Sequence, residues 1–397
     1  MSERTLSRVS RSLPILLAAL LAACGDSGPE TVGVVLPMSG PDKVYGQSLG
    51  RGIALAHEEL QRSAAELPFE LELRDSSSHP QRAAELAEEL YGDGAVAVIG
   101  GATDAEARAM VPAADRAGRV LLSPSAASAE LAGASRYVFR LSPSDYHQAI
   151  KMGGFAVLDL DLARTAVLMP ASGPGRELGQ VFQDEFERQG GEVVTAVGYP
   201  EQGADERLGR YVKDALAKRP QAVYLAATGG DRAARAVLAE LARRGFRGTV
   251  MTTSSFAAAG ILAEAGRGAE GLVVSAGSFD LEGEDPKVRA FVEAYREKYG
   301  AEPDAYAAHG YDAVMALAQA MVEQAEQGAG RRELWKGLRG LSGFQGVTGY
   351  IQFDERGNVG QFPRVFVVDH GELTELEPDG ARRRLAALGR ETGEARG

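Results

Sequence analysis

The chain of 397 residues is long enough for two domains, and 45% hydrophobic with 25% charged residues excludes intrinsic disorder over most of it. The formal net charge of −12 without any basic block argues against nucleic acid as a partner, because phosphate binding needs clustered Lys and Arg. The single cysteine excludes both a disulfide within the chain and a zinc site of several cysteines.

The N-terminus has the pattern of an export signal. Three arginines precede Leu13–Ala23, an apolar run of 11 residues, whereas a membrane-spanning helix needs about 20. The run ends in LAAC (21–24), which resembles a bacterial lipobox and implies that Cys24 becomes the lipidated first residue. We therefore expect a signal peptide at 1–23 and a lipidated tether at 24–30. The alternative is an ordinary cleaved signal followed by a chance cysteine.

Short apolar strands alternate with amphipathic helices from residue 31 to residue 275. Apolar runs predict strands at Thr31–Pro37, Phe69–Arg74, Ala95–Ile99, Val120–Ser123, Ala166–Met169, Val193–Val197, Ala222–Ala226, Thr249–Thr252 and Leu272–Ser275. Apolar residues three or four apart predict the helices between them, for example with Leu49, Ile53 and Ala56 on one face. Apolar strands separated by helices indicate parallel sheets covered on both faces.

The remainder of the chain changes character. Apolar spacing predicts two long helices, one around 288–299 and one around 314–322. Strands are expected at Thr348–Phe353 and Arg364–Val368. From residue 379 to residue 397 the chain is rich in Arg and lacks strand patterns, so we expect a disordered tail there.

Several stretches resemble the periplasmic solute-binding proteins of the leucine/isoleucine/valine-binding type. Their order and spacing between residue 31 and about residue 370 make the match specific to the fold. The stretches are VGVVLPMSGPDKVYG (32–46), RDSSSHPQRA (74–83), AVAVIGG (95–101), LLSPSAASAEL (121–131), FRLSPSD (139–145), YREKYGAEPDAYAAHGYDAV (295–314) and GVTGYIQFDERGNV (346–359).

The resemblance implies an α/β fold of two doubly wound parallel-sheet lobes, joined by three crossings, with a ligand cleft between them (a type I periplasmic binding protein). Lobe 1 would comprise 31–143 and 275–343. Lobe 2 would comprise 144–274 and 344–378. In open α/β sheets ligands bind beyond the carboxyl ends of the strands, where helix N-termini suit anionic or polar groups.

The resemblance also carries over ligand contacts, position by position. Asp104, after Thr103, sits where amino-acid binders usually place a serine that holds the ligand carboxylate. The other implied contacts are an aromatic that packs on the ligand (Tyr45), backbone and threonine contacts (Ser125, Ala126, Ala127), the common aspartate at the start of lobe 2 (Asp145), a position often occupied by tyrosine (Thr228) and the position of the acid that meets the ammonium (Ser254).

Three of these positions depart from the family pattern. Asp104 would repel a ligand carboxylate, by roughly 4 kcal/mol at about 4 Å and an effective dielectric of about 20. Ala127 replaces the threonine, and Ser254 replaces the acid. A neutral polar or cationic ligand therefore fits a pocket with Asp104 and Asp145 better than an α-amino acid in the usual pose.

Each of these positions also has a purely structural interpretation. Asp104 is an N-cap candidate for the helix predicted at 105–117. Tyr45 is a candidate packed aromatic of a loop, and Ser125–Ser128 is a candidate second cap.

The sequence contains no nucleophile–base pair, Walker A motif or metal-binding cluster, so we expect no catalytic residue, cofactor or metal.

The expected function is that of an extracytoplasmic substrate-binding lipoprotein of an ABC transporter. It would bind a small polar solute, an amino acid or related compound, by closing its lobes, and would work with an ABC permease. We expect a monomer on the periplasmic or cell-surface side, attached to the membrane only through lipid on Cys24. The alternative is a lipoprotein of the same fold with a degenerate cleft, acting as a sensor or as a regulator of, for example, cell-wall synthesis.

Overall fold

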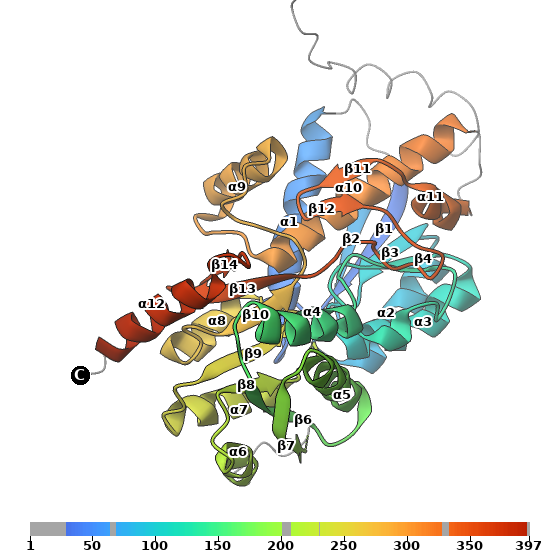
Figure 1. Cartoon of the computed structure of the whole chain (residues 1–397). Helices are drawn as coiled ribbons and strands as arrows, with labels where there is room; N and C mark the ends of the chain where they lie inside the picture. Colours follow the sequence, from blue (N-terminus) through green and yellow to red (C-terminus); the bar gives the residue numbers. More distant parts are fainter. Residues whose placement is uncertain (1–28, 64–68, 201–207, 230, 328–332, 395–397) are drawn as a thin grey trace, which may run out of the picture.

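The computed structural model describes residues 29–63, 69–200, 208–229, 231–327 and 333–394 (Figure 1). The expected signal peptide, Cys24 and most of the expected tether lie outside the described residues. The described chain forms two α/β lobes, and the green-to-yellow lobe lies below the other in this view. The predicted fold class is confirmed.

The sheet of lobe 1 has five parallel strands in the order β2-β1-β3-β4-β5. They are β1 (Glu30–Leu36), β2 (Phe69–Asp75), β3 (Ala97–Gly100), β4 (Val120–Ser123) and β5 (Val138–Arg140). The helices are α1 (Lys43–Ser63), α2 (Pro80–Gly92), α3 (Asp104–Ala117), α9 (Pro286–Tyr299), α10 (Ala305–Glu326) and α11 (Leu334–Gly340), with a 3₁₀ turn η1 (Ala129–Leu131).

Successive residues of β1 face opposite layers of lobe 1. Val34 packs in the cluster that contains Leu49 of α1 and Val314 of α10. Val35 packs instead with Leu86 of α2. Both faces of the sheet are therefore covered, which is why its strands are apolar throughout.

The sheet of lobe 2 has seven strands in the order β14-β13-β10-β9-β8-β6-β7. Five are parallel, namely β6 (Arg164–Pro170), β7 (Glu192–Tyr199), β8 (Ala222–Leu225), β9 (Thr249–Thr253) and β10 (Val273–Ala276). Two are antiparallel, β13 (Arg364–Asp369) and β14 (Glu372–Glu375). The helices are α4 (Asp145–Leu158), α5 (Gly173–Arg188), α6 (Leu208–Leu216), α7 (Arg232–Arg243), α8 (Ala259–Ala265) and α12 (Ala381–Glu394), with 3₁₀ turns η2 (Ser254–Phe256) and η3 (Gly266–Gly268).

The hairpin of β11 (Phe344–Gly346) and β12 (Gly349–Ile351) packs on lobe 1. The buried carboxylate of Asp312 in α10 accepts hydrogen bonds from the amides of Val347 and Thr348, both at 2.8 Å. A lobe-2 boundary at residue 344 is therefore too early, because the chain joins the second sheet only at β13. The crossing after β10 likewise follows residue 276 rather than residue 274.

The expected disordered tail is wrong for residues 381–394, which form α12. Ala381 and Leu388 are buried against Val365 and Val367 of β13, in the same cluster as Leu376. The apolar residues of this helix are few and stand among arginines, so the composition concealed a packed helix.

Candidate functional site

The carboxyl ends of the two sheets face each other, and segments from both lobes meet there. The chain crosses between lobes where the amide of Asp145 donates to the carbonyl of Ala127 at 2.8 Å. Tyr45 of α1 donates from its hydroxyl to the carbonyl of Ser255 at 3.0 Å. Tyr306 of α10 donates to the carbonyl of Ser254 at 3.2 Å. The structure thus brings together residues that are far apart in the sequence, at the place where this fold class binds ligands.

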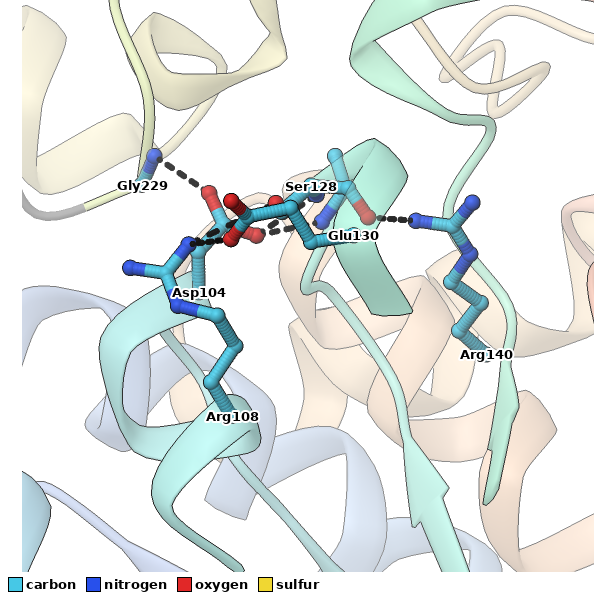
Figure 2. Close-up of polar contacts among 7 residues, drawn as sticks. Asp104, Arg108, Ser128, Glu130, Arg140 and Gly229 are labelled. Atoms are coloured by element: carbon cyan, nitrogen blue, oxygen red, sulfur yellow. Dashed lines mark hydrogen bonds and ion pairs between the residues drawn. The ribbon is translucent and has the colours of Figure 1, made fainter. Parts of the chain in front are cut away.

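Asp104 is held by backbone amides of both lobes (Figure 2). Its Oδ1 accepts from the amides of Ala127 and Ser128, each at 2.8 Å. Its Oδ2 accepts from the amide of Gly229, in lobe 2, at 3.2 Å. The side chain is buried, with 3% of the residue exposed. Asp104 therefore connects the loop after β4 with the loop after β8.

The interpretation of Asp104 as an N-cap is wrong. Thr103 is the N-cap of α3, with its Oγ1 accepting from the amide of Glu106 at 3.3 Å. Because Thr103 caps the helix, the side chain of Asp104 is available to the amides of the neighbouring loop.

The loop from Ser123 to Ser128 is organised by its own hydroxyls. Ser123 accepts from the amide of Ala126 at 3.1 Å and donates to the carbonyl of Gly101 at 2.9 Å. Ser125 donates to the carbonyl of Ala102 at 2.9 Å. Ser128 precedes η1 but makes no side-chain cap bond. These bonds fix the orientation of the amides that hold Asp104.

Two charged residues lie beside this loop. Arg140, a residue that the sequence interpretation overlooked, is buried and donates from Nη1 to the carbonyl of Ser128 at 2.5 Å (Figure 2). Its Nε donates to Oδ1 of Asn358 at 2.8 Å. Asp145 is 6% exposed, and its Oδ2 has no hydrogen-bond partner among the described residues. Burial raises the pKa of Asp145 well above its ordinary value; the nearby Asp104 charge raises it further, and Arg140 opposes both.

The aromatic residue expected on the ligand lies in a helix rather than in a loop. Tyr45 is 2% exposed, and its ring packs on that of Tyr306 with centroids 5.0 Å apart. Tyr306 was not predicted, because helical spacing alone marks it as one more apolar position. Thr228 is half-buried, and its carbonyl accepts from the amide of Asp231 at the start of α7.

A cavity of about 10 Å³ remains between the lobes, about the space that one water needs. His309, also unpredicted, lines it with an Nε2 that has no hydrogen-bond partner among the described residues. Burial lowers the pKa of His309 to about 4, so the imidazole is neutral at physiological pH. The other lining residues are small or hydroxylated: Ser125, Ser142, Ser254, Ala257, Ala276, Gly277, Ala305 and Tyr306.

A larger cavity of about 190 Å³ lies on the far side of lobe 2, where α7, η3 and α12 meet. It contains none of the residues at the carboxyl ends of the strands. Among the described residues, no three His, Cys, Asp or Glu side chains are grouped so as to hold a metal ion. In the same part of the chain, no helix combines the length and apolarity needed to cross a membrane.

The described site presents hydrogen-bonding groups from both lobes. Known proteins of similar sequence and structure identify the family of the chain. The family described as periplasmic binding protein matches residues 29–369. A Leu/Ile/Val-binding protein homolog of Brucella abortus is 25% identical over 355 residues, covering 87% of this chain and 91% of the relative. A leucine-, isoleucine-, valine-, threonine- and alanine-binding protein of Pseudomonas aeruginosa is 23% identical, covering 88% and 92%.

Solved structures agree with the architecture. A leucine-binding protein of Thermotoga maritima is 26% identical with a TM-score of 0.78, covering 88% of this chain and 98% of that one. A solute-binding protein of R. palustris in complex with benzoate shares the fold, with 22% identity, a TM-score of 0.76 and coverage of 88% and 96%. These relatives are solute-binding proteins and not enzymes, and the family implies an extracytoplasmic location. The chain belongs to the family of periplasmic binding proteins, and its relatives include Leu/Ile/Val-binding proteins.

Proposed function

We propose that this chain is the substrate-binding lipoprotein of an ABC transporter, which encloses a small polar solute between its lobes and presents it to a permease. The observation that supports this most directly is the convergence of hydrogen-bonding groups from both lobes at the carboxyl ends of the strands. Tyr45, Asp104 and Tyr306 of lobe 1 each contact a backbone group of lobe 2 there. Groups that bridge two lobes can hold a solute in the closed form and release it when the lobes separate.

The solutes bound by the relatives support a small molecule with a polar head group. Among them are binders of branched-chain amino acids and a binder of benzoate. All of these solutes are small, and each has a polar head group. An amino acid or a related compound is therefore the proposed class for this chain.

A second candidate function is that of a sensor or partner-binding regulator with a degenerate cleft. The contacts between lobes favour it, because Asp104 and Gly229 join the lobes directly and only about 10 Å³ of cavity remains. The two functions differ in whether the cleft opens to admit a solute.

A thermal-shift screen of the whole chain in detergent separates these functions. The panel comprises amino acids, amides, polyamines, short peptides, sugars, nucleosides and aromatic acids. A ligand at 1,000 times its Kd adds about 4 kcal/mol, which is a shift of several degrees for lobes of this size. The shift should vanish in Tyr306→Ala and persist in the control Leu158→Ala, whose side chain is exposed.

If no member of the panel shifts the transition, native mass spectrometry of the same sample shows whether a solute is already bound. A bare protein in both measurements would contradict the transport function and favour the regulator.

We also propose that Cys24 carries the lipid and that the protein is a monomer. Labelling of cells with radioactive palmitate should mark the natural chain and not Cys24→Ser. Light scattering behind a sizing column should give the mass of one chain plus its detergent. An unlabelled natural chain would indicate the ordinary cleaved signal instead.

A further inference from the structure

We propose that the carboxylate of Asp104 is a built-in anion that occupies the anion-binding amides of the cleft. The cleft would then select a solute that has no carboxylate and carries a nitrogen head group that donates hydrogen bonds. This inference rests on the proposed function and narrows its solute class, from amino acids and related compounds to the related compounds that lack a carboxylate.

The loop after β4 forms a site of converging amides. Two consecutive backbone amides, of Ala127 and Ser128, converge on one oxygen of Asp104 at 2.8 Å each (Figure 2). Successive amides aimed at one point form a concave site for an anion. The amide of Gly229 reaches the other oxygen from lobe 2. The donors that could receive a solute carboxylate in the closed form are thus already bound to the protein's own carboxylate.

Placing a solute carboxylate beside the carboxylate of Asp104 is unfavourable. Asp104 is 3% exposed, so its charge has little access to water when the lobes are closed. A solute carboxylate beside it would meet like-charge repulsion in a poorly screened site. The arrangement therefore disfavours the head group that an α-amino acid or a benzoate would bring.

The region between the lobes retains groups that accept hydrogen bonds. His309 lines the small cavity, and Asp145 begins the first helix of lobe 2 beside it. Both residues are at least nine-tenths buried, and among the described residues Oδ2 of Asp145 and Nε2 of His309 have no hydrogen-bond partner. Arg140, the buried cation near Asp145, directs Nη1 and Nε to Ser128 and Asn358. The oxygen of a carboxyl group and the unprotonated nitrogen of a neutral imidazole accept hydrogen bonds, as do the hydroxyls of the cavity wall. The complement of such a set is an N–H donor, in an amide, an amidine or an ammonium group.

Matched sets of probes on one carbon skeleton test this by calorimetry on the whole chain in detergent. One set is leucine, leucinamide, 4-methylpentanamide and 4-methylpentylamine. The other is benzoate, benzamide and benzylamine. The amide and amine members distinguish a neutral head group from a cationic one. In the natural chain, an amide or amine should bind at least about tenfold tighter than the carboxylate of its set.

Asp104→Ser should reverse this preference for amides and amines over carboxylates. It removes the carboxylate that occupies the amides of Ala127, Ser128 and Gly229. Carboxylate binding should strengthen at least about a hundredfold in this variant. Asp115→Ser is the control, since Asp115 lies in the same helix and contacts Ser135, outside the cleft. If Asp104→Ser does not fold, Asp104→Asn is the alternative, because it keeps the shape of the side chain and removes its charge. In Asp104→Asn the difference in affinity between the carboxylate and the amide or amine of each set should become smaller.

A natural chain that prefers the carboxylate member would overturn the inference and leave the proposed function standing. A preference that is the same in the Asp104 variants and in Asp115→Ser would also overturn it. Absence of binding by every probe in the natural chain and in Asp104→Ser would instead contradict the proposed function itself.

Discussion

Two buried carboxylates of lobe 1 are held in different ways. Asp312 accepts from the amides of Val347 and Thr348 and from the hydroxyl of Thr348 at 2.6 Å. Its pKa is nevertheless raised to about 6, because burial outweighs these bonds. Glu106 accepts from the hydroxyl of Ser76 at 2.5 Å, while its Oε2 has no partner among the described residues. Burial raises the pKa of Glu106 to about 7.

Glu106→Gln should make the protein more stable at pH 8 and change little at pH 5. A carboxyl whose pKa rises from 4.5 to about 7 on folding stabilises the folded state below pH 4.5. That contribution is lost as the pH rises to about 7, and it amounts to about 3 kcal/mol. Glutamine carries no such dependence, so the difference in unfolding free energy between variant and natural chain should grow across this interval.

Urea unfolding at pH 5 and pH 8 measures that difference. Glu130→Gln is the control, because Glu130 is half exposed and lies in a surface ion pair with Arg108. A difference between Glu106→Gln and the natural chain that is the same at both pH values would contradict the prediction. His309 contributes its own pH dependence, because its lowered pKa makes the protein lose stability on acidification from pH 6.5 to about 4. This contribution is the same in the variant and in the natural chain, so it cancels in the difference between them.

At the scale of elements, the contact between α1 and α10 depends on two glycines. A Cβ at Gly52 would overlap the carbonyl of Ala307, and one at Gly310 would overlap the carbonyl of Leu49. The two helix backbones therefore approach more closely than larger residues allow. This close approach places Tyr45 and Tyr306, one on each helix, with their rings in contact.

Gly310→Ala should lower the free energy of unfolding by about 1–3 kcal/mol, the usual cost of overpacking, because backbone atoms cannot move aside. Gly154→Ala is the matched control in α4, where a Cβ would meet nothing closer than a side-chain oxygen 3.6 Å away. That control should gain about 0.5–1 kcal/mol, because alanine suits a helix interior better than glycine. Chemical denaturation of both variants checks the opposite signs; equal effects would contradict the packing argument.

The packing of α12 is open to an equally direct measurement. Leu388→Ala should lower the free energy of unfolding by about 2–4 kcal/mol, because it removes a buried leucine from the lobe-2 core. Arg383→Ala, at an exposed position of the same helix, should change stability by less than about 0.5 kcal/mol. A Leu388→Ala variant as stable as the natural chain would contradict the packing of α12 and favour the disordered tail expected from the sequence.

The sequence was informative where the structure depends on local spacing. Apolar residues three and four apart predicted α1, and apolar runs predicted β1 and β6, because these patterns are set by neighbours in the chain. The assignment of residues 344–351 to lobe 2 was wrong. These residues pack on lobe 1 through Asp312, which lies more than 30 residues earlier in the sequence, so neighbouring residues do not reveal the contact. The strand β5 was overlooked, since a run of three residues carries too little pattern.

The candidate site was predictable in its location and less so in its chemistry. The resemblance indicated Asp104, but the three amides that hold it follow only from the folded loops. Arg140, Tyr306 and His309 look like ordinary polar or helical positions in the sequence. Their burial at the cleft becomes visible only when both lobes are in place.

At the scale of the whole molecule, the closed arrangement depends on a few polar contacts and on the chain crossings. The hydroxyls of Tyr45 and Tyr306 donate across the cleft to adjacent residues, Ser255 and Ser254. Ser254 is held in turn, because its amide donates to Oε1 of Gln148 at 2.9 Å. These contacts favour the closed form only to the extent that they are lost when the lobes open.

The double variant Tyr45→Phe with Tyr306→Phe should therefore open the molecule without unfolding it. Each hydrogen bond contributes about 0.5–1.5 kcal/mol net, so losing both should move the equilibrium by about 1–3 kcal/mol toward the open form. Small-angle X-ray scattering should then show a larger radius of gyration, and solute affinity should fall by roughly 5- to 150-fold. Tyr146→Phe, at a half-exposed tyrosine of α4, should leave both values unchanged. Because solute binding and lobe closure are linked, a weaker affinity at an unchanged radius would show that the tyrosines act on the solute and not on closure.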